Sequence, residues 1–120
     1  EGTPPAVCPI LTLKKRADYL ALTRASRQAM PSLLVQARDR QDGFDTVRVG
    51  FTCSKKVGNA VARNRAKRRL REAARHVLPH HARPGWDYAL IGRTGATGSQ
   101  PFAELIHHLE RALTKLHRAP

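Results

Sequence analysis

The residues that could do chemistry are basic, and they lie close together near the middle of the chain. From Lys55 to Arg75 there are nine lysines and arginines and a single acid, Glu72. A guanidinium group grips phosphate oxygens through two parallel hydrogen bonds, whereas a lysine ammonium acts as a point charge. The cluster therefore predicts contacts with the phosphates of a polyanion.

A helix expected over residues 59–77 carries this cluster and has two distinct faces. At about 100° per residue, one face holds Ala62, Ala66, Leu70, Ala73 and Val77, and the opposite face holds Asn64, Lys67, Arg68, Arg71 and Arg75. A merely solvated helix usually interleaves acids, because like charges four residues apart repel by about 0.2–0.5 kcal/mol per pair. The basic side chains of this helix repel one another with only one acid among them, which favours phosphates of a bound polyanion as their counter-charge.

Side chains that could catalyse a reaction or hold a metal ion are scarce. With 9 acids against 22 basic residues, the chain shows no carboxylate cluster of the kind that a free-standing nuclease needs. The adjacent histidines at 80–81 and 107–108 lack the i,i+4 spacing that places two ligands on one helical face. His76 and His80 have that spacing, but we expect Pro79 to break the helix between them. We predict no catalytic residue and no metal ligand.

The composition limits the class of protein. A chain of 120 residues has room for one domain, and 41% hydrophobic residues are enough for a modest core. The net charge of +13, with 16 arginines, predicts a nucleic-acid partner. Residues 1–9 contain three prolines and are expected to form a flexible arm, and residues 10–118 the domain.

Membrane and redox roles are not indicated. No stretch of about 20 apolar residues is present. Cys8 and Cys53 lack CxxC spacing and follow no signal peptide, so we expect reduced, inert thiols in a cytoplasmic protein.

Periodicity and turn residues predict an α+β fold. The expected elements are a helix over 14–27, strands over 33–37 and 46–54, the basic helix over 59–77, a strand over 88–92 and a helix from Pro101 to Leu116. The first two strands are expected to pair as a β-hairpin, and Pro79 with Pro84 and Gly85 to end the basic helix. The result would be a single-domain two-layer sandwich, with helices on one sheet face and the other face or a groove open.

The stretch at residues 55–73, KKVGNAVARNRAKRRLREA, resembles the signature of the bacterial ribonuclease P protein, with its Arg-Asn-Arg core intact at 63–65. Flanking matches follow in the family's order at residues 13–19, 48–51, 86–93 and 102–105, so that the resemblance covers nearly everything from Leu11 to Leu116. A lone RNR tripeptide would be weak support, whereas a long match with ordered flanks is specific.

The resemblance implies a fold and an activity. The fold is ribosomal protein S5 domain 2-like, with a left-handed βαβ crossover that departs from the usual right-handed rule. The activity is that of the protein subunit of ribonuclease P, which binds the catalytic ribonuclease P RNA and the 5′ leader of precursor tRNA. The RNA performs the Mg²⁺-dependent endonucleolytic cleavage that gives the mature tRNA 5′ end. Mg²⁺ is expected mainly on RNA and substrate, and the free protein is expected to be monomeric.

The resemblance also assigns residues to two sites. The RNA-binding residues would be Lys55, Lys56, Arg63, Asn64, Arg65, Lys67, Arg68 and Arg71. The leader would lie in a cleft between the sheet and the first helix, with Tyr19, Phe51 and Tyr88 as the matching aromatic residues. Core packing is an equal alternative for both tyrosines, and Phe51 is expected to form a wall of the core or of the cleft rather than to recognise a specific base. Thr23 and Gln36 stand where aromatic residues are common in the family, which predicts a more polar cleft.

Composition alone fits other binding modules equally well. A generic RNA-binding module such as a ribosomal protein is the main alternative, and a DNA regulator is a second. A helix-turn-helix protein needs two short helices around a tight turn, whereas the basic helix here is expected to follow a strand. The long signature stretch argues against both.

Overall fold

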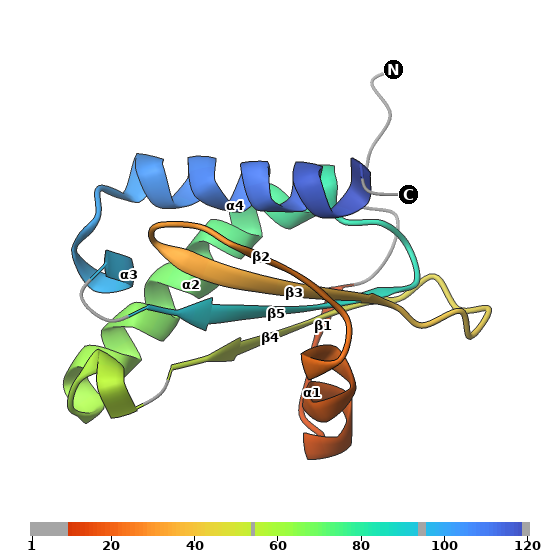
Figure 1. Cartoon of the computed structure of the whole chain (residues 1–120), viewed down its shortest axis with the longest axis horizontal. Helices are drawn as coiled ribbons and strands as arrows, with labels where there is room; N and C mark the ends of the chain where they lie inside the picture. The colour runs from red at the N-terminus through yellow and green to blue at the C-terminus, as the bar shows by residue number, and fades with distance from the viewer. Residues whose placement is uncertain (1–9, 54, 94–95, 119–120) are drawn as a thin grey trace.

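A five-stranded mixed sheet organises the computed structural model, which describes residues 10–53, 55–93 and 96–118 (Figure 1). The strands are β1 (Ile10–Thr12), β2 (Ser26–Ala29), β3 (Leu33–Asp39), β4 (Val47–Thr52) and β5 (Trp86–Gly92). Their order in the sheet is β1-β4-β5-β3-β2. β4 is parallel to β1 and β5, whereas β3 is antiparallel to β5 and β2.

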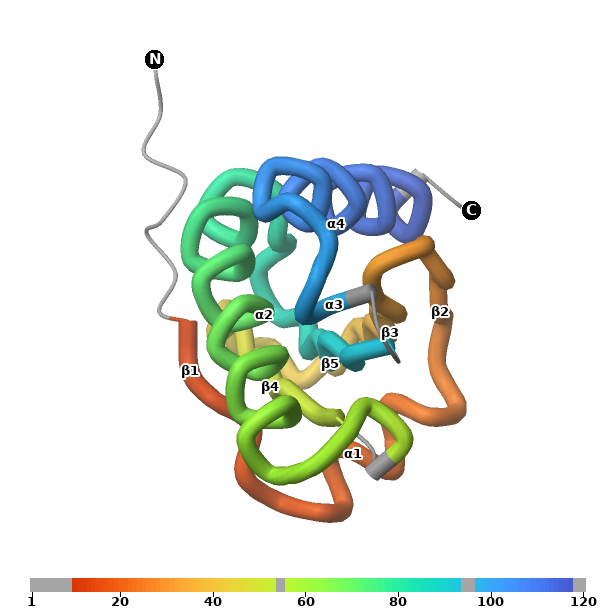
Figure 2. The backbone as a smooth tube through the Cα atoms, turned by 90° about the vertical axis from the view of Figure 1, so that its left-hand side faces the viewer, coloured from red at the N-terminus to blue at the C-terminus, as the bar shows by residue number. Residues whose placement is uncertain are grey.

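The helices cover the two sheet faces unequally. They are α1 (Arg16–Thr23), the 3-10 turn η2 (Lys55–Val57), α2 (Ala60–His81), the short α3 (Ala96–Ser99) and α4 (Phe102–Arg118). Figure 2 shows α2 and α4 on one face of the sheet and α1 on the other. The α+β class and the single compact fold are therefore confirmed, with α1 leaving part of its own face open.

The connection from β4 through α2 to β5 joins two parallel, neighbouring strands. This crossover runs through α2 on one side of the sheet and is left-handed, as the family resemblance implies (Figures 1 and 2). This hand is the exception among βαβ units.

The expected hairpin between the strands at 33–37 and 46–54 is wrong, because β5 lies between β3 and β4. The hairpin in the sheet is formed by β2 and β3 instead. β5 takes the central position because its residues Asp87 to Leu90 are buried on both faces, which requires a strand on each side. Proximity in sequence suggested the wrong partner for β3.

The main core lies between the sheet and the pair α2 and α4. On α2, the predicted apolar face is confirmed by the burial of Ala66, Leu70, Ala73 and Val77. The predicted stripe of α4 is confirmed as well, since its leucines at 105, 109 and 113 are fully buried. The small alanines bring α2 close to the sheet, so its outer face is held as a rigid surface.

Two edge strands and one helix end differ from expectation. The first helix stops at Thr23 rather than near residue 27, and residues 26–29 form β2 against β3, with Ser26 opposite Ala37. β2 has no alternation of apolar residues, so only its pairing with β3 makes it a strand. The three-residue β1 was likewise not predicted.

Contrary to expectation, Pro79 does not end the basic helix, because α2 continues to His81. Proline in the last turn removes one hydrogen bond, and the burial of Val77 and Leu78 just before it keeps this turn on the core. His76 and His80 therefore lie on one continuous helix. Even so, the described residues contain no group of three or more side chains that could hold a metal ion.

The end of α4 is anchored by a buried tyrosine. Tyr88 is fully buried; its hydroxyl lies 2.7 Å from Nε2 of His117 and accepts a hydrogen bond from the Arg83 backbone N–H at 2.9 Å. Burial, and then the charge of Arg83, lowers the pKa of His117 from 6.5 to about 4. His117 is therefore neutral in the folded protein at physiological pH.

This environment predicts a loss of stability in mild acid. Between pH 6.5 and about 4 the unfolded chain binds a proton at residue 117 that the folded protein excludes, so the free energy of unfolding should fall as the pH drops through this window. Urea unfolding at several pH values checks this. The variant His117→Gln should lose that part of the pH dependence, and an identical profile in both proteins would contradict the assignment.

Candidate RNA-binding surface

The first turns of α2 are fixed by a helix cap, and the basic residues follow directly after this cap. The side chain of Asn59 caps the helix by accepting a hydrogen bond from the Ala62 backbone N–H at 2.9 Å. Gly58 precedes Asn59 and has a φ of +144°, a backbone conformation that residues other than glycine rarely adopt. The Arg-Asn-Arg sequence therefore falls within the first two turns of a capped helix.

The outer face of α2 carries a line of exposed side chains, which we call the basic ridge: Asn64, Arg65, Arg68, Arg71 and Arg75. From Arg65 to Arg75 the ridge extends about 15 Å along the helix. Within the described part of the chain, the side chains of Arg65 and Arg68 make neither a hydrogen bond nor an ion pair. Arg71 lies 5.5 Å from the centre of the Phe51 ring, and Arg75 pairs with Glu72 at 3.3 Å. Such a ridge can contact several phosphates at once.

The other predicted RNA-binding residues lie beside the ridge rather than on it. Arg63 and Lys67 are half-buried, and their charges act on the thiol of Cys53 at the end of β4. The Nε of Arg63 is buried and has no hydrogen-bond partner among the described residues. Lys56 is exposed, and the side chain of Lys55 lies outside the described part of the structure.

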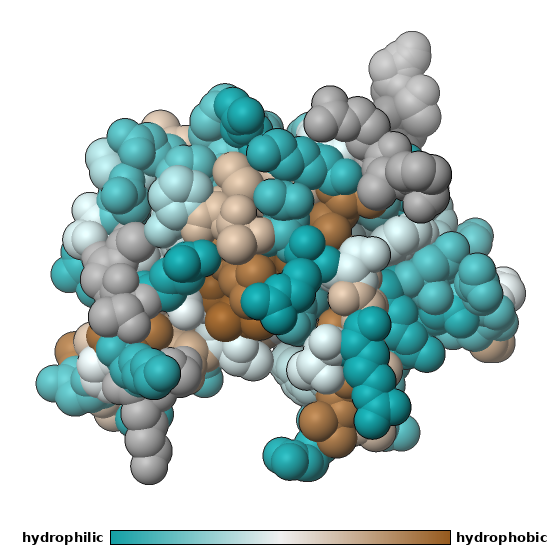
Figure 3. Space-filling model, viewed as in Figure 1, coloured by the Kyte–Doolittle hydropathy of each residue, from teal (hydrophilic) through white to brown (hydrophobic). Residues whose placement is uncertain are grey.

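The opposite sheet face, on the α1 side, is arranged in three rows of side chains that run across β3, β5 and β4. The first row, which we call the open row, consists of Leu34, Ile91 and Thr52, each half-buried. Figure 3 shows apolar surface over the strands below α4, and a hollow between α1 and the end of the molecule where α2 begins. Part of this sheet face is therefore accessible to a ligand.

The second row, formed by Gln36, Ala89 and Gly50, lies under α1. Ala89 packs with Leu13 and Leu22 in a small second core. The ring of Tyr19 lies directly on Gly50, and its hydroxyl donates to the Leu13 carbonyl at 3.2 Å. Desolvation by burial raises the pKa of Tyr19. Tyr19 thus forms the border between α1 and the sheet.

The third row consists of Arg38, Asp87 and Arg48, and it ties α1 to the sheet. Asp87 is fully buried and accepts two hydrogen bonds from Arg48, at 2.6 and 2.8 Å, and one from Arg40 at 2.8 Å. Arg48 also reaches Asp18 of α1 at 3.3 Å. This charged network holds α1 at a set distance from β4 and β5.

Two of the three residues predicted for the leader cleft lie on the wrong face of the sheet. Phe51 and Tyr88 point toward α2 and α4, where Tyr88 is fully buried, so neither borders the cleft on the α1 side. Only Tyr19 lies there. The sequence of β4 could have shown this for Phe51. Side chains alternate between the two faces of a strand, and Phe51 therefore lies on the same face as the core residues Val47 and Val49.

The residues that depart from the family pattern are polar in different ways. Gln36 is buried in the second row, and the Thr23 hydroxyl donates to the Leu20 carbonyl at 2.6 Å. Cys53 is a free thiol whose pKa is raised by burial, and Cys8 lies outside the described residues.

A substitution at Gly50 tests the contact between α1 and the sheet. A Cβ atom at this position would lie 2.5 Å from the Tyr19 ring, so Gly50→Ala should displace α1 and cost about 1–3 kcal/mol of unfolding free energy. Chemical denaturation measures the loss. Gly98→Ala is the matched control, because nothing lies within 4 Å of its added Cβ. Equal stability of the two variants would show that Tyr19 does not pack on Gly50.

Comparisons with known proteins agree with this architecture. Residues 10–117 match the family Ribonuclease P. The chain is 64% identical over 109 residues to the ribonuclease P protein component of Ruegeria pomeroyi, covering 90% of this chain and 87% of the relative. It is 52% identical over 104 residues to the protein of the same name from Caulobacter vibrioides, covering 87% of this chain and 69% of the relative.

Solved structures show the same fold. The RNase P protein of Staphylococcus aureus superposes with a TM-score of 0.72 at 28% identity, covering 87% of this chain and 93% of that one. The RNase P protein of Thermotoga maritima gives a TM-score of 0.71 at 26% identity, covering 91% and 97%. From the matched residues, the relatives and the shared fold, we conclude that this chain belongs to the Ribonuclease P family.

Proposed function

We propose that this chain is the non-catalytic protein subunit of ribonuclease P, which binds the catalytic RNA and the 5′ leader of precursor tRNA. Membership of the family implies a part in tRNA processing and a partnership with ribonuclease P RNA. The observation that carries the RNA-binding proposal is the basic ridge, on which Arg65 and Arg68 have no partner within the described residues. Phosphates of the catalytic RNA supply the missing counter-charge.

The leader of the precursor is proposed to lie on the α1 side of the sheet, along the open row and against Tyr19. Single-stranded RNA is bound through exposed bases that pack on apolar and aromatic side chains, together with nearby cations. The half-buried Leu34 and Ile91 offer such a surface, and Arg63 and Lys67 lie near the end of β4 beside it. This assignment replaces Phe51 and Tyr88 with residues of the open row.

The chemistry is proposed to belong to the RNA. Asp18, Asp42 and Asp87 are all paired with arginines, so these carboxylates are already neutralised within the protein. We therefore expect Mg²⁺ to be held mainly by the RNA and the substrate, and none to be bound tightly by this chain.

A monomeric free protein and a cytoplasmic location complete the proposal. In the residues that the structure describes, no helix is long and apolar enough to cross a membrane. A generic RNA-binding module remains the second candidate function, because a basic ridge alone fits it.

Cleavage of a precursor tRNA by a bacterial ribonuclease P RNA at low Mg²⁺, with and without this protein, tests the proposal. Precursors with long and very short leaders are compared. A gain that depends on both the protein and the leader is expected. Cleavage by the protein alone would indicate a nuclease, and binding without any gain would favour the generic module.

A further inference from the structure

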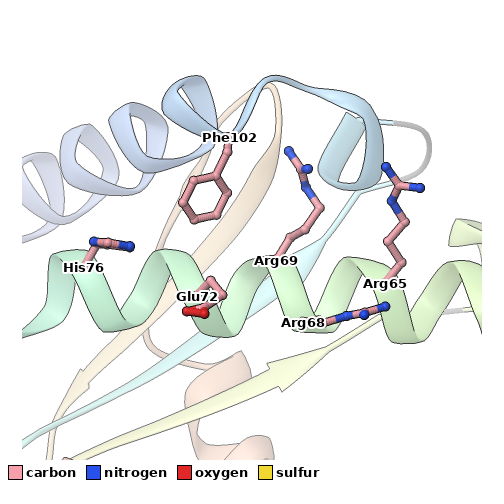
Figure 4. A pocket seen from close by; sticks show the side chains of 6 residues that line it. All are labelled: Arg65, Arg68, Arg69, Glu72, His76 and Phe102. Carbon is pink, nitrogen blue, oxygen red and sulfur yellow. The ribbon is translucent and has the colours of Figure 1, made fainter.

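A pocket of about 580 Å³ lies between α2 and the start of α4, on the side of the molecule away from α1. It is lined by Arg65, Arg68, Arg69, Glu72, His76 and Phe102 (Figure 4). Its volume falls within the range of pockets that hold small organic groups. Neither the basic ridge nor the open row accounts for its aromatic and acidic side chains.

The wall of this pocket is held in place by contacts within the protein. Arg69 donates from Nε to the Thr97 carbonyl at 3.0 Å and from a second nitrogen to the Gln100 carbonyl, which fixes its guanidinium plane. This guanidinium lies 5.8 Å from the centre of the Phe102 ring. The ring of His76 meets Phe102 edge-on, with centres 5.9 Å apart. Phe102 and Arg69 therefore form a fixed surface against which a flat ring could stack.

Around Glu72 and Phe102, the chemistry of the lining favours a base rather than a phosphate. Glu72 is the only acid between residues 55 and 75, and its carboxylate repels an anion at this position. It is paired with Arg75 through an exposed contact at 3.3 Å, which leaves further acceptor capacity. A carboxylate accepts hydrogen bonds from the N–H groups of a nucleobase, and an unpaired guanine presents two such donors side by side on its Watson–Crick edge.

We propose that this pocket holds an unpaired guanine of the ribonuclease P RNA, with the base against Phe102 and Arg69, its N–H groups donating to Glu72, and the adjoining phosphates on Arg65 and Arg68. The inference rests on the proposed function. The base belongs to the catalytic RNA because the pocket opens beside the basic ridge, on the face of the sheet opposite the open row proposed for the leader.

Binding of ribonuclease P RNA by the full chain tests the stacking contact. Phe102→Leu should weaken binding about tenfold without changing the salt dependence, because the base no longer stacks on a ring while the arginines still reach the phosphates. Phe44→Leu is the matched control and should leave affinity unchanged, because this 70% exposed residue lies between β3 and β4 and does not line the pocket. Thermal unfolding of each variant confirms that it is folded.

The variant Glu72→Gln provides a second test, in which binding of two RNA oligonucleotides is expected to change in different ways. Short uridine oligonucleotides with and without one central guanosine are titrated against the full chain. Loss of a negative charge should strengthen binding of the all-uridine probe, whereas the preference for guanosine shown by the unchanged protein should disappear. The glutamine keeps one acceptor but presents an N–H₂ group toward the guanine donors.

Three results would overturn the inference. Unchanged affinity of Phe102→Leu for ribonuclease P RNA, while the unchanged protein binds it normally, would refute the pocket but leave the proposed function intact. A loss seen only with precursor tRNA would refute the assignment to the catalytic RNA. The absence of any guanosine preference in the unchanged protein would refute the role of Glu72. Failure of the proposed function would differ from all three, because the unchanged protein would then either not bind ribonuclease P RNA or bind it without any leader-dependent gain in cleavage.

Discussion

Replacing Arg65 and Arg68 together with alanine should weaken binding to ribonuclease P RNA on the order of a hundredfold at moderate salt. Each arginine is exposed on the ridge without a partner in the described residues, so its substitution removes phosphate contacts without breaking the fold. A hydrogen bond to a charged group contributes about 1.5–3 kcal/mol, and the double variant removes two such bonds at the lower figure. Affinity measured over a range of salt concentrations checks the size of the effect.

The salt dependence separates this effect from unfolding. The slope of log affinity against log salt should flatten by about one unit for each phosphate that the protein no longer neutralises. Arg111→Ala with Lys115→Ala removes the same charge from the far end of α4 and is the control. Circular dichroism establishes that both double variants are folded. A ridge variant that is folded and keeps both its affinity and its slope would remove these arginines from the interface.

Replacing Asp87 with alanine should have the largest effect on stability, about 3–5 kcal/mol. The carboxylate is fully buried and holds Arg40 and Arg48, whose side chains are 6% and 28% exposed. Its removal leaves two guanidinium groups close together, with only the partly exposed Asp42 and Asp18 as counter-charges. Urea unfolding followed by circular dichroism measures the change in the free energy of unfolding.

Asp42 offers a control that shares a partner with Asp87. It pairs with the same Arg40 at 2.8 Å, but its own side chain is 39% exposed. Asp42→Ala should therefore cost much less stability than Asp87→Ala, because ion pairs at the surface contribute little. Similar losses in the two variants would show that burial of the Asp87 network contributes little.

The Asp87 network also has a consequence for function. Arg48 joins Asp87 of β5 to Asp18 of α1, so the network sets the position of α1 over the sheet. Mild disruption through Arg48→Lys, which cannot reproduce the paired hydrogen bonds, should reduce the leader-dependent gain in processing more than it reduces binding of the catalytic RNA. Equal losses in both would place the leader elsewhere.

The basic helix and the last helix were predictable because the relevant information is local. The spacing of Ala66, Leu70 and Ala73 determines which face of α2 is buried, and therefore which face is left for Arg65 and Arg68. The leucines of α4 repeat at the same helical period. Charge and periodicity within one helix do not depend on its neighbours, so both predictions were correct apart from the position of the α2 end at Pro79.

The arrangement of the strands could not be predicted in this way, since pairing joins segments far apart in sequence. β5 enters between β3 and β4, and β2 becomes a strand only through its contact with β3. This arrangement decided that Tyr88 is a core residue bonded to His117, while Tyr19 lies on Gly50 at the edge of an open surface.

The amino-acid sequence by itself determined that this protein is α+β and strongly basic, and that one of its helices has an apolar face opposite an arginine-rich face. Composition and the spacing of apolar residues are properties of each segment, so they can be read without knowing the neighbouring segments. Only the tertiary structure decided which side chains meet. It brought Phe102 of α4 to Arg69 and Glu72 of α2, and it gathered Asp18, Arg48 and Asp87 from three elements. Such contacts depend on how the elements pack against one another, and the pattern within any single element does not specify that packing.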